Sequence, residues 1–307
     1  MLKAAAGRNN KAQKGRYPVN YVPNEAKQQK RPRRVLEETE VSMYVVAIYG
    51  WREETPELVQ VLAGALGLMA FEARQRLIGG GPSVVASFAD LRQARELASN
   101  VNRDGLKALV VDATEVRMRS GFLVTRRFEF DKRVLKVETG NGQQATIPYA
   151  EMELLLQGTS IVGYSETKTV VEHKFSMGKT LLAGGIPMTK KVERQEEVSG
   201  EESEPMLYLY ANDRPAVIFS LNGMNYDGFG AEMKLSRKLN FAHLLSQLRL
   251  HAPDAAYDDR LLARVAQARL LGPAQGRESS LDLAAEILAR SLLASRGRRE
   301  DAPELYI

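Results

Sequence analysis

The run Met43-Tyr-Val-Val-Ala-Ile-Tyr49 decides the fold of the first part of the chain. β-Branched and aromatic residues fill it and Gly50 closes it, a pattern typical of a buried strand. Pro56 then stands where a first helical turn tolerates proline. Apolar residues recur at helical spacing after it: Leu58, Val59, Leu62 and Leu66. We therefore expect a strand followed closely by a helix that packs on it.

The sequence predicts a β-α-α-β-α-β order for residues 43–112. Gly67 ends the first helix, and a second, short helix stops at Gly79-Gly80-Gly81-Pro82. A strand over 83–87, a helix that runs through Asn100 and a strand over 106–111 complete the order. We expect a single sheet with helices on one face.

A short motif in this region resembles a known family. The string Gly64-Ala65-Leu66-Gly67-Leu68, followed by Glu72-Ala73-Arg74 and Leu77, is similar to the C-terminal domain of the bacterial ribosomal stalk protein. That family has a Gly-Ala-x-Gly-Leu turn between its first two helices and a Glu-Ala-Lys step on the second. The resemblance covers residues 43–112 and implies the same small α/β fold.

The family recruits translation GTPases through a basic stripe on these helices, and this chain departs from it. Gln60 and Ala63 stand where the family has Lys and Arg, and the first helix begins with the acidic residues Glu53, Glu54 and Glu57. We expect no binding of such factors, and a face that prefers a basic or apolar partner. The candidate contacts are Leu58, Val61, Leu68, Met69 and Arg74.

Residues 113–250 alternate with period two, which indicates strands. The expected strands cover 116–119, 122–130, 134–138, 145–149, 150–156, 160–164, 168–175, 192–198, 206–211 and 216–219. An amphipathic helix over 240–250 closes the unit. Many short strands before one helix predict a small antiparallel barrel or sandwich. The fold class is therefore α+β, with helices again at the C-terminus.

This unit looks like the pleckstrin-homology superfold, and Ile147-Pro-Tyr-Ala-Glu-Met-Glu-Leu154 is similar to a step in its bacterial members. The resemblance implies a binding module for lipid headgroups, peptides or proteins, without choosing among them. An anion pocket would need clustered bases, and the available ones are Arg117, Arg119, Arg126, Arg127, Lys132 and Arg133. Alternation places Arg126 and Arg127 on opposite faces, so we favour a solvated strand face over an anion site.

The sequence offers no assembled catalytic motif. The chain has no cysteine and three histidines, which argues against a metal centre. Gly178-Lys179-Thr180 mimics the end of a phosphate-binding loop, but His173 stands where that loop needs glycine. We expect no enzyme activity, cofactor or metal. A long connection between two predicted strands carries four lysines and precedes an acidic stretch over 193–204. It is either a solvated hairpin or an interaction surface. In the second case the candidate interaction residues are Lys174, Lys179, Lys190 and Lys191.

The basic charge of the chain is concentrated at its start. The chain carries a net charge of +5, and residues 1–34 hold ten Lys or Arg against one acid. Residues 1–42 lack hydrophobic periodicity and cannot fold alone, so we expect a disordered tail. It is a candidate nucleic-acid arm, a solvated tail, or an over-extended start if Met43 is the first residue. The arm candidates are Lys11, Lys14, Arg16, Arg31, Arg33 and Arg34.

Residues 251–307 form a helical section in this interpretation. A helix over 257–271 ends at Gly272-Pro273, with Asp254, Asp258 and Asp259 at its start, and a second helix follows Ser279-Ser280. No apolar run approaches the roughly 20 residues of a membrane span. The leading hypothesis is a non-enzymatic cytoplasmic adaptor that binds a protein partner. The alternatives are a nucleic-acid- or ribosome-associated protein and a peripheral membrane protein, of which we consider membrane contact the less favoured; the oligomeric state stays open.

Overall fold

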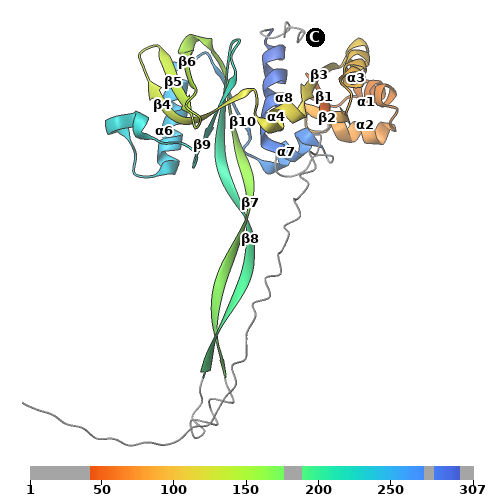
Figure 1. The fold of residues 1–307 in the computed structure, drawn as a ribbon. Helices are drawn as coiled ribbons and strands as arrows, with labels where there is room; N and C mark the ends of the chain where they lie inside the picture. The colour runs from red at the N-terminus through yellow and green to blue at the C-terminus, as the bar shows by residue number, and fades with distance from the viewer. Residues whose placement is uncertain (1–41, 176–188, 273–279, 298–307) are drawn as a thin grey trace, which may run out of the picture. The chain divides into compact units, whose positions relative to one another are not determined.

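The structure is a computed structural model that describes residues 42–175, 189–272 and 280–297, with the backbone alone between 162 and 202. These described residues belong to one compact unit. It contains a three-stranded and a seven-stranded sheet (Figure 1).

The three-stranded sheet has β1 (Tyr44–Tyr49) in the centre, with β2 (Ser83–Phe88) and β3 (Lys107–Asp112) antiparallel on either side. Helices α1 (Pro56–Leu66) and α2 (Ala70–Leu77) connect β1 to β2. Helix α3 (Leu91–Arg103) connects β2 to β3, so the predicted β-α-α-β-α-β order is confirmed.

Local sequence signals set the ends of the first helix. The Thr55 side chain accepts a hydrogen bond of 3.3 Å from the amide of Leu58, and Pro56 occupies the first turn. Gly67 ends the helix with φ 64°, a conformation that glycine adopts without strain. The indole of Trp51 then donates to the carbonyl of Leu77 at 2.8 Å, which ties the end of α2 to the end of β1.

Both faces of the small sheet are covered, so the expectation of helices on one face was wrong. Val46 and Ile48 pack with α1, α2 and α3. Val45 and Ala47 belong to a second core cluster, together with α8 (Ser280–Ser295) and residues of the larger sheet. Four consecutive buried residues in β1 are typical of a strand covered on both faces.

The seven-stranded sheet has the order β10-β7-β8-β9-β4-β5-β6. Its strands are β4 (Phe122–Phe130), β5 (Val134–Thr139), β6 (Gln144–Pro148), β7 (Met152–Phe175), β8 (Thr189–Ala211), β9 (Ala216–Ser220) and β10 (Ala256–Leu261). Two pairings are parallel, β4 with β9 and β10 with β7. The sheet is therefore mixed and, over the described strands, not a closed barrel, which corrects the expected antiparallel barrel or sandwich.

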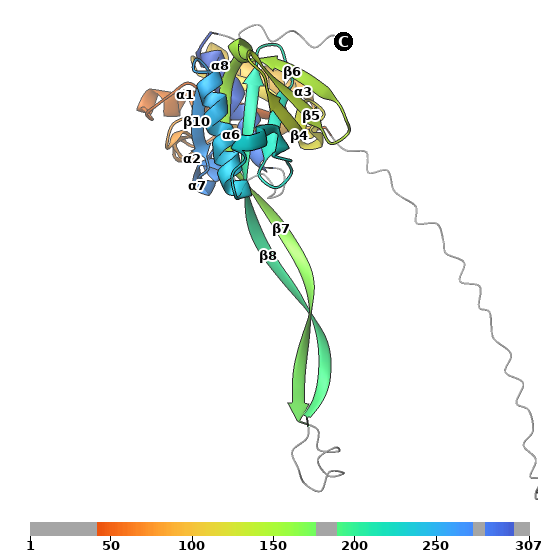
Figure 2. The same ribbon diagram turned by 90° about the vertical axis from the view of Figure 1, so that its left-hand side faces the viewer.

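The strands expected at 160–164, 168–175 and 192–198 are parts of one long hairpin. β7 and β8 pair from Met152 with Ala211 to Phe175 with Thr189. β10 pairs with β7 as far as Gly158, and β9 pairs with β8 from Met206 onward. Beyond those points the two strands pair with each other (Figures 1 and 2).

Two further expectations were wrong about element type. Residues 116–119 do not form a strand, because Asp112 accepts from the amides of Thr114 and Glu115 and starts helix α4 (Ala113–Met118). The helix expected over 257–271 is split into β10 and α7 (Arg264–Leu271). Residues 256–261 form a strand rather than a helix because they pair with the buried strand β7.

The closing helix of the larger sheet is α6 (Arg237–His251), which starts three residues before the expected 240–250. Ser236 caps it, since its hydroxyl accepts from the amide of Leu239 at 3.3 Å. Two 3-10 segments, η1 (Tyr149–Glu151) and η2 (Asp227–Glu232), complete the described elements. Phe241, Leu244 and Leu248 of α6 pack on the face of the sheet opposite α8.

Candidate functional site

An apolar surface at the start of α2 is the first candidate site. Met69 and Phe71 are exposed by 71% and 70%. Of the predicted apolar contacts, Leu58 and Val61 are half-buried and pack on the core, and Leu68 is half-buried. We call Met69 and Phe71, with the acidic residues of α1 and α2, the Met69–Phe71 surface.

Phe71 was not among the predicted contacts of this surface. Ala73 and Leu77 are four residues apart and fully buried, so they define the inner face of α2. Phe71 lies two positions before Ala73 and therefore points to another side of the helix. The offset of two positions from Ala73 is the feature of the sequence that indicates an exposed Phe71.

The charge of Arg74 is compensated within the protein. Its Nη2 and Nε lie 2.6 and 2.8 Å from Oε1 of Glu54. The hydrogen bond and the charge of Glu54 raise the pKa of Arg74. Glu53, Glu57 and Glu72 remain exposed, so the surface is apolar with acidic neighbours, as the sequence predicts.

A second candidate surface comprises the end of η2, the residues that follow it and the first turn of α6. Every residue from 231 to 239 is exposed. Large apolar side chains alternate with cations there, and Leu235 is fully exposed. We call these residues the 231–239 loop: Ala231, Glu232, Met233, Lys234, Leu235, Ser236, Arg237, Lys238 and Leu239.

Buried and half-buried polar groups hold this loop in place. Asn240 is 4% exposed; its Oδ1 accepts from the amide of Lys234 at 2.7 Å, and its Nδ2 donates to the carbonyl of Lys234 at 3.0 Å. Arg237 Nη1 donates to the carbonyls of Asn222 and Met224 at 3.2 and 3.0 Å. Hydrogen bonds at Lys234 and at Arg237 therefore hold the loop on either side of Leu235.

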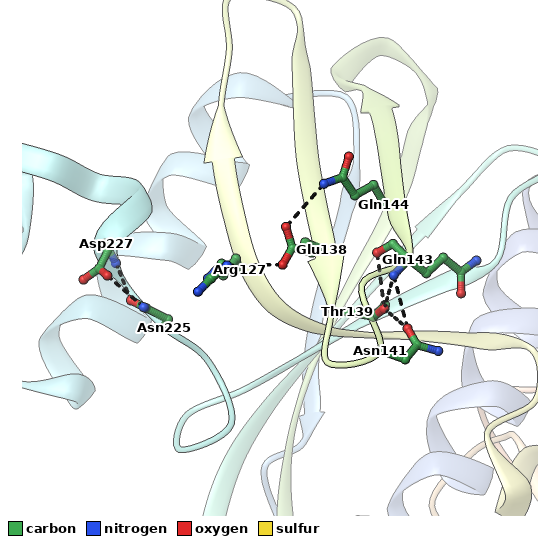
Figure 3. A network of polar contacts seen from close by, with 8 residues as sticks. All are labelled: Arg127, Glu138, Thr139, Asn141, Gln143, Gln144, Asn225 and Asp227. Carbon is green, nitrogen blue, oxygen red and sulfur yellow. Dashed lines mark hydrogen bonds and ion pairs between the residues drawn. The ribbon is translucent and has the colours of Figure 1, made fainter.

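A groove of about 380 Å³ lies beside the loop, lined by Arg126, Tyr226, Asn240 and residues of the loop itself. Arg126 Nη1 donates to the carbonyl of Gly223 at 2.6 Å. Asn225 and Asp227 form two mutual hydrogen bonds of 2.8 Å at its edge (Figure 3). The polar groups of the groove are largely engaged within the protein.

The six bases considered for an anion pocket do not come together. Arg119 pairs with Asp282, and Arg127 pairs with Glu138 at 3.4 Å, whose other oxygen accepts from Gln144 (Figure 3). Lys132 and Arg133 line a different groove. Arg126 and Arg127 are both exposed, since the register of β4 against β5 shifts between Thr125 and Arg127. This corrects the expected placement on opposite faces.

A buried polar cluster joins α8 to β8. Tyr208 donates to Asp282 Oδ1 at 2.5 Å, and Arg119 Nε donates to Oδ2 at 2.7 Å. Burial, and then the charge and hydrogen bond of Asp282, raise the pKa of Tyr208 well above its usual value. Burial and the charge of Glu286 do the same for Tyr210. The cluster therefore connects residues of β8, α8 and the end of α4 that lie far apart in the sequence.

The histidines of the described part have structural surroundings. His243 Nε2 lies 3.1 Å from Glu232 Oε2, and the ring of His251 stacks on Tyr149 with centroids 4.5 Å apart. Within the described ranges, no group of three His, Asp or Glu side chains could hold a metal ion. No single described helix is long and apolar enough to cross a membrane, although α1 and α2 satisfy the criteria jointly across a 113° bend.

Several predicted residues fall where no contact is described. The arm candidates Lys11, Lys14, Arg16, Arg31, Arg33 and Arg34 lie outside the described residues, as does Lys179. Lys174, Lys190 and Lys191 lie on the long hairpin, where Lys174 pairs with Lys190 in the backbone register.

Comparisons with family models, with curated proteins and with solved structures found no match.

Proposed function

We propose that this chain is a non-enzymatic interaction protein that binds a partner protein through the Met69–Phe71 surface. The observation that carries the proposal is the exposure of two large apolar side chains, Met69 and Phe71, two residues apart on a helix that is anchored to the core. Burying such a side chain is worth about 1.5–3 kcal/mol. A partner that covers both would gain that energy without reordering the helix.

The charges around this surface define the partner. Glu54 compensates Arg74, while Glu53, Glu57 and Glu72 stay exposed. An apolar patch with a basic rim is therefore the complementary surface, and an acidic translation factor would meet like charge.

The finer fold assignments are part of the same proposal. The antiparallel β2-β1-β3 order with two helices between the first strands supports a stalk-protein-like unit. The helix α6, which follows the last strand of the β4–β9 region and packs on it, supports a pleckstrin-homology-like unit. Both resemblances describe binding modules, which agrees with an adaptor.

Affinity purification of the full chain from its source cells tests the proposal with two matched variants. Phe71→Asp places a charge in the surface, and Val265→Asp does the same at a comparably exposed apolar position on α7. We expect a reproducible partner that Phe71→Asp loses, that Val265→Asp keeps, and that salt weakens. A partner retained by Phe71→Asp, or no reproducible partner, rejects the proposal.

A further inference from the structure

The 231–239 loop is a second, independent surface that the proposed function does not use. It includes the end of η2, which packs against β4, and the first turn of α6, at the margin of the larger sheet (Figure 1). The residues of α6 pack in a different core cluster from those of α1 and α2. A role for the loop therefore does not depend on the Met69–Phe71 surface.

The apolar side chains of the loop are displayed by a fixed backbone. Leu235 is fully exposed, and Met233 and Leu239 are more than half exposed. The buried side chain of Asn240 holds both main-chain groups of Lys234, the residue before Leu235. Three large apolar side chains that are exposed within seven residues, on a backbone held by a buried polar group, make this loop a candidate contact surface.

The cations of the loop are available to an anionic partner. Lys234 and Lys238 form no ion pair within the part of the chain that the structure describes. The neighbouring carboxylate of Glu232 is engaged with His243, and Asp227 is engaged with Asn225. Arg237 is directed to the carbonyls of Asn222 and Met224 and fixes the loop.

We propose that the 231–239 loop docks on the surface of an anionic lipid bilayer. Met233, Leu235 and Leu239 enter the interfacial region, and Lys234 and Lys238 contact lipid phosphates. A bilayer accommodates a projecting apolar tip surrounded by cations, because its acyl boundary is deformable and its headgroups are negative. A protein partner would instead need a pocket around the tip, together with acidic groups at fixed positions.

The cysteine-free chain allows a test that separates the loop from the basic N-terminal segment, which could bind vesicles by itself. Leu235→Cys in the full chain carries a single environment-sensitive fluorophore, and Val265→Cys is the matched control at another exposed apolar position. The probes are vesicles of phosphatidylcholine alone and vesicles that also contain phosphatidylserine. We expect a blue-shifted, stronger emission from position 235 with the anionic vesicles only, and no change from position 265.

A charge variant completes the experiment. Lys234→Ala with Lys238→Ala in the Leu235→Cys chain removes two cations, and we expect it to raise the lipid concentration at half-maximal emission on the order of tenfold. Both lysines are exposed, so the melting temperature should stay unchanged. Unchanged emission at position 235 while the chain still sediments with anionic vesicles overturns the proposal, as does an equal response at position 265. An emission change on addition of an acidic protein, without any change on vesicles, overturns it in favour of a protein partner.

Discussion

The phenol of Tyr208 donates a 2.5 Å hydrogen bond to Asp282, and this contact joins the centre of the large sheet to helix α8. The other oxygen of Asp282 accepts from Arg119, just after α4. Apolar residues of α8 share a core cluster with β1 of the small sheet. One helix therefore connects two sheets that the sequence analysis treated as separate units.

Removing the Asp282 carboxylate should destabilise the fold. In Asp282→Ala the buried Tyr208 hydroxyl and the half-exposed Arg119 lose their partner. We expect a loss of about 1–3 kcal/mol in the free energy of unfolding, measured by urea denaturation. Asp282→Asn, which can still accept from Tyr208, should lose less. Glu129→Ala removes a 3.5 Å surface pair with Lys136 and should change stability by less than about 1 kcal/mol; equal losses in all three variants would contradict this account.

Stability should fall at alkaline pH because of three buried tyrosines. Burial raises the pKa of Tyr226 to about 12, and burial also raises the pKa values of Tyr208 and Tyr210 well above the usual value of a tyrosine. Below pH 10 these phenols are protonated in both the folded and the unfolded state, so they leave stability unchanged. Between pH 10 and the pKa values of the folded state, these phenols ionise only in the unfolded state. The free energy of unfolding therefore falls as the pH rises through this range. The chain has eleven tyrosines, so the share of the phenolate absorbance that these three contribute should rise together with unfolding; full phenolate absorbance with unchanged circular dichroism would contradict this account.

Gly228 should be a position where no side chain fits. A Cβ placed there would lie 1.9 Å from the main-chain oxygen of Phe128, and a strand backbone cannot yield as a side chain can. We expect Gly228→Ala to lower the melting temperature by several degrees, since η2 must move away from β4. Gly140→Ala is the matched control, because a Cβ at Gly140 meets no atom within 4 Å. Equal melting temperatures for the two variants would show that η2 does not pack as described.

The sequence predicted the small α/β unit well because its signals are local. Pro56, Gly67 and the alternation of apolar residues fix the ends and faces of its helices. The prediction was wrong where the structure of a segment depends on residues that are distant in the chain. Residues 257–261 have a helical pattern but pair with β7, about a hundred residues earlier in the chain. The covered second face of β1 depends on α8, and the 231–239 loop depends on Asn240, so neither could be read from its own segment.

An isolated fragment of residues 43–112 should be less stable than the full chain. It leaves Val45, Ala47 and Val111 uncovered, because α8 and the larger sheet bury them. We expect such a fragment to aggregate or to bind a hydrophobic dye, and binding data obtained with it would include contacts of this artificial face. Size-exclusion chromatography of the fragment beside residues 42–297 measures this. A monomeric fragment with the same melting temperature would mean that α8 does not stabilise the small sheet.

The last prediction concerns Asn240 and the shape of the 231–239 loop. In Asn240→Ala the amide and the carbonyl of Lys234 lose their partner at 2.7 and 3.0 Å. Since Asn240 is buried, the fold should also lose about 1–2 kcal/mol. Hydrogen exchange should quicken by more in the 231–239 peptide than in the 152–158 strand, whose Leu154, Leu155 and Leu156 are fully buried and whose amides exchange only when the whole fold opens. Asn225→Ala, which removes the two exposed hydrogen bonds with Asp227 at the neighbouring turn, is the control. Exchange that quickens equally in both peptides would mean that Asn240 supports the whole sheet rather than the loop.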